Sequence, residues 1–168
     1  MSTAALVSLQ EYLTTTYRPD CDYVDGELIE RNVGQKDHGK LQRGLLAWFG
    51  QRRRALNVDA FPEQRIAVGP HRYRIPDVCV TPLPEPDEQV FTTPPYICIE
   101  VLSPDDTLLS LQQRFDDYLK MGVPNVWAID PASRRAWSIT PAGHFEALDG
   151  ILRTSDGRIA MPLADLFE

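Results

Sequence analysis

Cysteine is scarce in this sequence, and its three cysteines, Cys21, Cys79 and Cys98, lie far apart. No CxxC pair is present, so the spacing supports neither a zinc knuckle nor a disulfide framework. Cys79 and Cys98 lie inside apolar, strand-like runs, where a cysteine usually acts as a small buried hydrophobic residue. We therefore expect free thiols in a reducing compartment.

Long hydrophobic runs are also lacking. No apolar stretch approaches the roughly 18 residues that suggest a membrane-spanning helix. Residues 1–7 are small and apolar, but they carry no basic leader of the kind that begins a signal peptide. We expect a cytoplasmic protein with no membrane partner.

Positive charge is in deficit, with 17 lysines and arginines against 24 acidic residues and a net charge of −7. This balance counts against a broad basic surface that binds nucleic acid by phosphate neutralisation alone. It leaves room for a local basic groove, since some of the acids can line a metal site. Arg52–Arg54, together with Arg72 and Arg74, are candidates for such a DNA-facing patch. A basic run at a helix end, however, more often complements the helix dipole.

The order of the predicted elements is mixed. Ser8 to Glu11 form a capping-box pattern that predicts a short helix over 9–15, and Asp25-Gly26 predicts the turn of a hairpin over 21–30. Apolar residues at helical spacing predict a long helix over 37–56. The later patterns predict strands over 58–61, 64–68, 73–80, 96–102 and 126–129, a helix between 105 and 122, hairpins over 136–148 and a C-terminal cover over 161–167. We expect one α/β domain over residues 1–168, with helices packed on a mixed sheet.

Glu100 is a carboxylate in the middle of the near-continuous apolar run 96–102. An unpaired buried carboxylate is costly, so a proton, an arginine or a metal must compensate its charge. The alternative is that Glu100 lies at the strand end and reaches solvent. From this residue alone, the two interpretations carry equal weight.

Asp77 is the second acid in an apolar context, within Pro76-Asp77. A Pro-Asp pair alone is more typical of a turn or a helix cap. Together with Glu100 it gains weight, because two neighbouring strands that each carry one acid can direct both carboxylates to one hard cation. Mg²⁺ is commonly held by one or two carboxylates plus waters and substrate phosphates. Such an ion can activate water and stabilise charge on a phosphoryl oxygen.

The segment Arg74-Ile75-Pro76-Asp77-Val78, followed by Ile99-Glu100-Val101-Leu102-Ser103-Pro104, resembles the PD-(D/E)XK nuclease superfamily. More narrowly, it resembles a bacterial branch of restriction-endonuclease-like proteins of unassigned function. The resemblance extends to residues 23–28, to His38 and to residues 118–131, and so covers most of the chain. It implies a restriction-endonuclease-like core, with a four-stranded mixed sheet flanked by helices. It also implies Mg²⁺-dependent hydrolysis of phosphodiester bonds, with Mn²⁺ able to substitute.

Carried over residue by residue, the resemblance implies that Asp77 and Glu100 are catalytic metal ligands. Glu27 matches an acid in the opening hairpin of this branch and is expected to approach the metal. His38 is a candidate contact to the substrate, although a polar residue in the first turn of a helix is the commoner explanation.

The expected active-site lysine is missing. Where the wider superfamily has it, two residues after the second acid, this chain has Leu102. Where this branch has it, four residues before a helix tyrosine, this chain has Arg114, counted back from Tyr118. Arginine keeps the positive charge but effectively never loses its proton, so Arg114 can stabilise charge but cannot act as a general base. Three other lysines could substitute, but solvated surface positions explain them better: Lys36, Lys40 and Lys120.

Two functions are compatible with these residues. The first is a metal-dependent endonuclease that acts on nucleic acid, DNA before RNA, as a homodimer. The alternative is a catalytically weakened or inactive nuclease-fold module that binds nucleic acid or protein, which Leu102 and Arg114 favour. A third interpretation, an unrelated α/β protein, requires the order of the motifs to be accidental.

Overall fold

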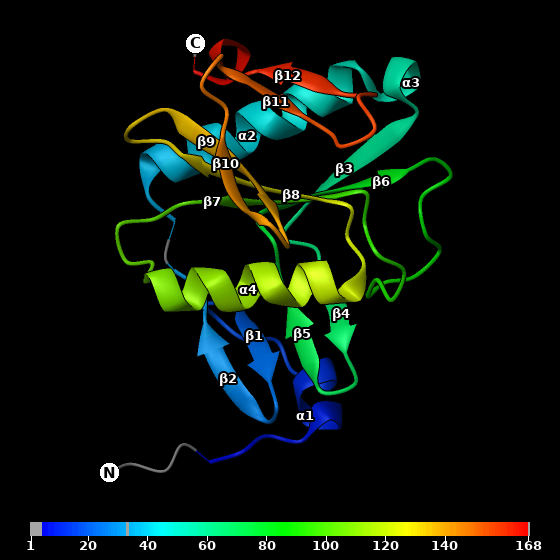
Figure 1. Ribbon diagram of the computed structural model, residues 1–168. Helices are drawn as coiled ribbons and strands as arrows, with labels where there is room; N and C mark the ends of the chain where they lie inside the picture. The colour runs from blue at the N-terminus through cyan, green and yellow to red at the C-terminus, as the bar shows by residue number, and fades with distance from the viewer. Residues whose placement is uncertain (1–4, 33, 168) are drawn as a thin grey trace.

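The computed structural model describes residues 5–32 and 34–167, and its helices and sheets form successive layers (Figure 1). Helix α2, Lys36–Gln51, covers one face of a six-stranded sheet, and helix α4, Leu108–Met121, covers the other face. A four-stranded sheet lies on the far side of α4. The predicted class, a mixed α/β fold with a central mixed sheet flanked by helices, is confirmed.

The larger sheet has the strand order β10-β9-β8-β7-β6-β3. Its strands are β3 Val58–Pro62, β6 Val78–Pro82, β7 Ile97–Val101, β8 Asn125–Asp130, β9 Arg135–Thr140 and β10 Gly143–Glu146. Strands β7 and β8 are parallel, and the other neighbours are antiparallel. The sheet is therefore mixed, as expected, but it has six strands where the resemblance implied a core of four.

The smaller sheet is antiparallel, with the order β2-β1-β5-β4. It consists of β1 Cys21–Val24, β2 Glu27–Glu30, β4 Ile66–Gly69 and β5 Arg72–Arg74. The hairpin turn has φ values of 51° at Asp25 and 96° at Gly26, which suit a tight turn between twisted strands. Helix α1, Leu9–Thr14, begins at Ser8, whose hydroxyl accepts a hydrogen bond from the Glu11 N–H at 3.2 Å. The predicted hairpin and short helix are thus confirmed.

The strand predicted over 73–80 is wrong in one important respect, because it is two strands in two different sheets. Strand β5 ends at Arg74 in the smaller sheet, and β6 begins at Val78 in the larger sheet. Pro76 lies between them and has no N–H to donate to a ladder. The Ile75 N–H donates a hydrogen bond to the carboxylate of Asp22 at 3.0 Å. The crossing places Asp77 where the chain passes from one sheet to the other.

The predicted long helix and the predicted basic patch also need correction. The helix is interrupted at Arg52, and a separate short helix, α3 Arg53–Leu56, follows. Arg52 lies over the Trp48 ring at 4.3 Å. Arg74 is 2% exposed and lies in the smaller sheet, far from α3 (Figure 1). The five arginines therefore do not form one DNA-facing patch, because Arg52–Arg54 lie at or in α3 and the other two lie in β5, far from it (Figure 1).

The larger sheet divides the buried apolar residues into two clusters. The cluster on the α2 side includes Leu45 of α2 itself, Val78 and Ile99, whereas Cys79, Cys98 and Phe115 belong to the cluster on the α4 side. Cys79 lies directly opposite Cys98 in the register of β6 and β7, and both are fully buried. Cys21 is buried in β1, and all three thiols are free, as predicted.

The C-terminal segment packs over α2 and so forms the predicted C-terminal cover. A small hairpin, β11 Ile151–Arg153 with β12 Ala160–Pro162, leads into a 3₁₀ turn, η1 Leu163–Leu166, which lies beside α2. Within the part of the chain that the structure describes, no helix combines the length and the apolar character needed to cross a membrane.

Candidate active site

The pairing of β6 with β7 brings the two predicted acids together. In that antiparallel register Val78 lies opposite Ile99, so Asp77, just before β6, comes level with Glu100. The N–H of Val101 donates to Asp77 Oδ2 at 2.7 Å, which ties Asp77 to the next residue along β7. Asp77 is 4% exposed and Glu100 is 1% exposed. The two carboxylates are therefore adjacent, and both lie below the surface.

Asp77 is neutralised by an arginine and a histidine. Arg31 Nη2 lies 2.6 Å and His38 Nε2 lies 3.2 Å from Asp77 Oδ1. Burial acts to raise the pKa of Asp77, but the hydrogen bond from His38 and the charge of Arg31 outweigh it and hold this pKa below its ordinary value. The same hydrogen bond raises the pKa of His38. The geometry therefore favours an ionised Asp77 beside a His38 that retains its proton.

Glu100 has a separate set of partners, both from α4. Arg114 Nη1 donates to its Oε2 at 2.9 Å, and the Tyr118 hydroxyl donates to its Oε1. Burial raises the pKa of Glu100 to about 7, Arg114 works against that rise, and the charge of Asp77 adds to it. Two crowded carboxylates in the interior form an environment that favours a bound cation.

Arg114 also contacts a third acid. Its Nη2 donates to Asp106 Oδ1 at 2.6 Å, and Asn32 Nδ2 donates to the same oxygen at 3.1 Å. The guanidinium therefore bridges Glu100 in the sheet to Asp106 in the turn before α4. The guanidinium of Arg114 occupies the position where the resemblance predicts a lysine. A single ammonium group could not make both of its hydrogen bonds in the same geometry.

A second buried network holds α4 against the smaller sheet. Arg74 donates to Asp22 through Nη1 at 3.0 Å and to Asp117 through Nε at 2.7 Å. Arg72 adds two hydrogen bonds to Asp117, at 3.1 and 3.0 Å. Asp117 directly precedes Tyr118, so this network helps to position the hydroxyl that binds Glu100.

Sequence reasoning missed four of the charged residues: Asp22, Asp106, Asp117 and Arg31. Asp22 carried the same signal as Glu100, an acid inside a strand-like run, and could have been found by it. Asp117 lies next to the tyrosine from which Arg114 was located. Nothing in the sequence around Arg31 distinguishes it from a surface arginine.

Glu27 does not join the acids. It lies exposed in β2 beside the hairpin turn, opposite Val24, and among the described residues it makes no hydrogen bond or ion pair with Asp77 or Glu100. The buried acid of this hairpin is Asp22, on the neighbouring strand. The three alternative lysines are exposed, as expected: Lys36, Lys40 and Lys120.

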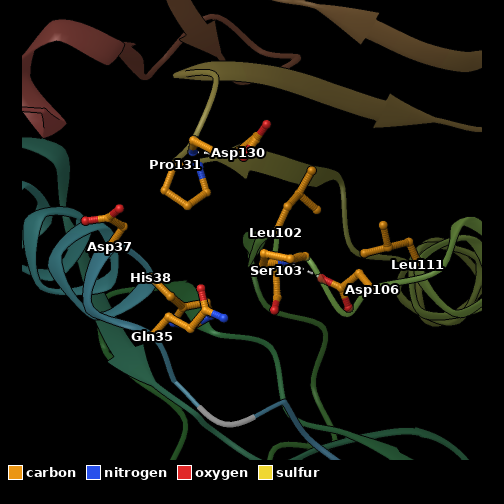
Figure 2. Close-up of a pocket in the computed structure, with 11 residues that line it drawn as sticks. Gln35, Asp37, His38, Leu102, Ser103, Asp106, Leu111, Asp130 and Pro131 are labelled. Atoms are coloured by element: carbon orange, nitrogen blue, oxygen red, sulfur yellow. Dashed lines mark hydrogen bonds between the residues drawn. The ribbon is translucent and has the colours of Figure 1, made fainter.

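A pocket of about 370 Å³ opens beside His38 (Figure 2). Gln35, Asp37 and His38 line it from the start of α2, and Ser103 lines it from the segment after β7. Pro131, after the end of β8, lines it as well. A second pocket, of about 250 Å³, is lined by Arg31 and Arg114 among others, and Asp106 lines both pockets. Groups that contact the two acids thus line two separate hollows at the surface.

The two acids fit a hard divalent cation in number and type. Within residues 5–32 and 34–167, no group of three or more His, Cys, Asp or Glu side chains is placed to hold a metal. Two carboxylates, however, are what Mg²⁺ commonly takes from a protein. A cation would also relieve the repulsion by which Asp77 raises the pKa of Glu100. The fit has one condition, which is that Arg31 and a cation compete for the same carboxylate.

A protein family and a solved structure are similar to this chain. A family model named Uma2, described as "Putative restriction endonuclease", matches residues 9–160. The solved structure of a "putative nuclease belonging to DUF820" from Anabaena variabilis is similar to this chain, with a TM-score of 0.81. The two sequences are 22% identical over 96% of this chain and 97% of that one, a level at which the likeness shows the fold alone. Comparison with curated proteins gives no match.

Proposed function

This chain belongs to the Uma2 family, described as "Putative restriction endonuclease", and on that premise we propose that it is a metal-dependent endonuclease acting on nucleic acid. The observation that carries the proposal is the pair of adjacent buried carboxylates, Asp77 and Glu100, on neighbouring strands of the mixed sheet. The proposed substrate is DNA, and the proposed assembly is a homodimer whose two sites reach two strands.

In this proposal Asp77 and Glu100 hold Mg²⁺, for which Mn²⁺ can substitute. The bound ion supplies an activated water and neutralises charge on the phosphoryl oxygen. His38 lines the larger pocket, and its hydrogen bond with Asp77 raises its pKa, which suits it to donate a hydrogen bond to a phosphate oxygen of the substrate. Arginine effectively never loses its proton, so Arg114 cannot act as a general base. Its hydrogen bond to Glu100 makes it a positioning residue for that carboxylate.

The test is conversion of supercoiled plasmid to nicked and linear forms by the purified chain. We expect conversion with Mg²⁺ or Mn²⁺ and none with EDTA. A labelled RNA of the same sequence, run in parallel, decides between the two kinds of nucleic acid. Absence of cleavage on both substrates with either metal would contradict the nuclease proposal.

The alternative function, a binding module without catalysis, has a specific observation in its favour. Each acid already has an arginine on it, Arg31 on Asp77 and Arg114 on Glu100, so both are satisfied as ion pairs. A nuclease fold of this kind could persist as a binding module without catalysis. Replacement of Arg114, which stands in the expected lysine position, distinguishes the nuclease from the binding module.

The variant Arg114→Lys is expected to increase the initial rate of plasmid nicking about tenfold or more, since a lysine in this place can exchange a proton and an arginine cannot. The same metals and plasmid are used. The control is Arg135→Lys, whose arginine is exposed and pairs with Glu146 at 2.6 Å, and which should leave the rate unchanged. If Arg114→Lys neither cleaves nor binds Mn²⁺, the binding module becomes the better description.

A further inference from the structure

Arg31 is an interior side chain on an exposed segment. It follows β2 directly, and its neighbours Asn32 and Gly34 are exposed, yet only 14% of its own side chain reaches solvent. The guanidinium lies 2.6 Å from Asp77 Oδ1 and 3.7 Å from Glu63 Oε1. Because Glu63 is half exposed and this second contact is long, Asp77 is the principal partner of Arg31.

The position of Arg31 conflicts with a metal on Asp77. Asp77 Oδ2 is tied to the backbone by the N–H of Val101 at 2.7 Å, whereas the partners of Oδ1 are side chains, so Oδ1 is the oxygen at which partners can exchange. Arg31 Nη2 is the nearer of the two groups on Oδ1, at 2.6 Å, and His38 Nε2 lies 3.2 Å from the same oxygen. A divalent cation and a guanidinium on one carboxylate oxygen repel each other strongly in a buried site. Binding of a cation through Oδ1 therefore requires Arg31 to leave.

The space beside Arg31 offers it a second position. The pocket of about 250 Å³ is lined by Arg31, Arg74 and Arg114, together with several acids. Two of these acids, Asp22 and Asp106, are already paired with Arg74 and Arg114. Arg74 Nη2 is buried and has no hydrogen-bond partner among the described residues. A guanidinium released here keeps its fork of donors, which matches the oxygens of a phosphate.

We propose that Arg31 exchanges between Asp77 and a backbone phosphate of the nucleic acid, and so couples metal binding to substrate binding. In the metal-free protein it neutralises Asp77. When a divalent cation takes Oδ1, Arg31 turns to the phosphate. This inference rests on the proposed function, and it makes Arg31 a positioning residue for the same site.

The first arm of the test measures Mn²⁺ affinity by electron paramagnetic resonance, without nucleic acid. Arg31→Gln is expected to bind Mn²⁺ about tenfold more tightly than wild type, because the competing charge is gone. The matched control is Arg65→Gln, whose arginine has a side chain 20% exposed and pairs with Asp20 instead of Asp77. Arg31→Lys, which can still pair with Asp77, should stay within about threefold of wild type. Arg31→Met, which also removes the competing charge, replaces the glutamine variant if that one folds poorly.

The second arm measures binding of a fluorescent duplex with non-hydrolysable linkages. With Mn²⁺ present, Arg31→Gln should bind the duplex about tenfold more weakly than wild type, whereas in EDTA the two should bind equally. Equal Mn²⁺ affinity in wild type and Arg31→Gln would overturn the exchange while leaving the nuclease proposal intact. Absence of Mn²⁺ binding in every variant would instead remove the metal site, and the exchange with it.

Discussion

Replacement of Asp77 by asparagine is expected to lower the rate of metal-dependent plasmid nicking by about a thousandfold, the effect of losing several kcal/mol of metal-ion catalysis. Asparagine keeps the shape of the side chain and can still accept the Val101 N–H. It removes the charge that attracts a cation, and while its oxygen accepts the Val101 N–H its amide nitrogen faces Arg31. The initial rate of nicking and the affinity for Mn²⁺ should therefore fall together.

The matched control for this experiment is Asp59→Asn. Asp59 lies in β3, an edge strand of the same sheet, and pairs with Arg53 at 2.7 Å. Its loss should change the nicking rate by less than about threefold, as expected for a surface ion pair. Equal activity in wild type and Asp77→Asn would point to a contaminating nuclease, and the proposal would lose its principal support.

The second large effect concerns stability. Arg74→Met is expected to lower the free energy of unfolding by about 3–5 kcal/mol, because it removes the arginine that pairs with buried Asp22 and one of the two arginines that pair with buried Asp117. Arg74 contacts Asp22 at 3.0 Å and Asp117 at 2.7 Å. Urea unfolding followed by tryptophan fluorescence measures the change.

Arg135→Met is the comparison for Arg74→Met. Arg135 also makes two hydrogen bonds to one carboxylate, that of Glu146, but its side chain is 56% exposed. An exposed pair of this kind contributes about 1 kcal/mol or less. If the two variants unfold at the same urea concentration, the buried network is not what holds the smaller sheet to α4.

The two central acids could be predicted because the information is local. Glu100 stands out inside an apolar strand, and Asp77 follows a proline directly before a second apolar strand. Antiparallel pairing of two strands that are consecutive in this sheet then brings them together. The hairpin at Asp25-Gly26 and the helix that ends at Gly122, where φ is 99°, were predictable for the same reason, since turn and cap residues act within a few positions.

The partners of these acids could not be predicted, because they depend on tertiary packing. Arg31 reaches Asp77 across 46 positions in the chain, and Arg74 reaches Asp117 across 43. No periodicity in the sequence distinguishes an arginine that turns inward from one that remains in solvent. The crossing at Pro76 was likewise hidden, because five of the eight residues from Tyr73 to Val80 are apolar or aromatic and read as one strand.

The placement of the three cysteines gives the molecule built-in reporters of its own local opening. Cys79 and Cys98 face each other in the larger sheet, and Cys21 lies in the smaller one. A buried thiol reacts with a small alkylating reagent only when its strand transiently detaches, so labelling rates yield a separate opening free energy for each sheet. Since Asp77 stands at the junction between the two sheets, equal energies would indicate one cooperative unit. Unequal energies would identify which of the two sheets opens first.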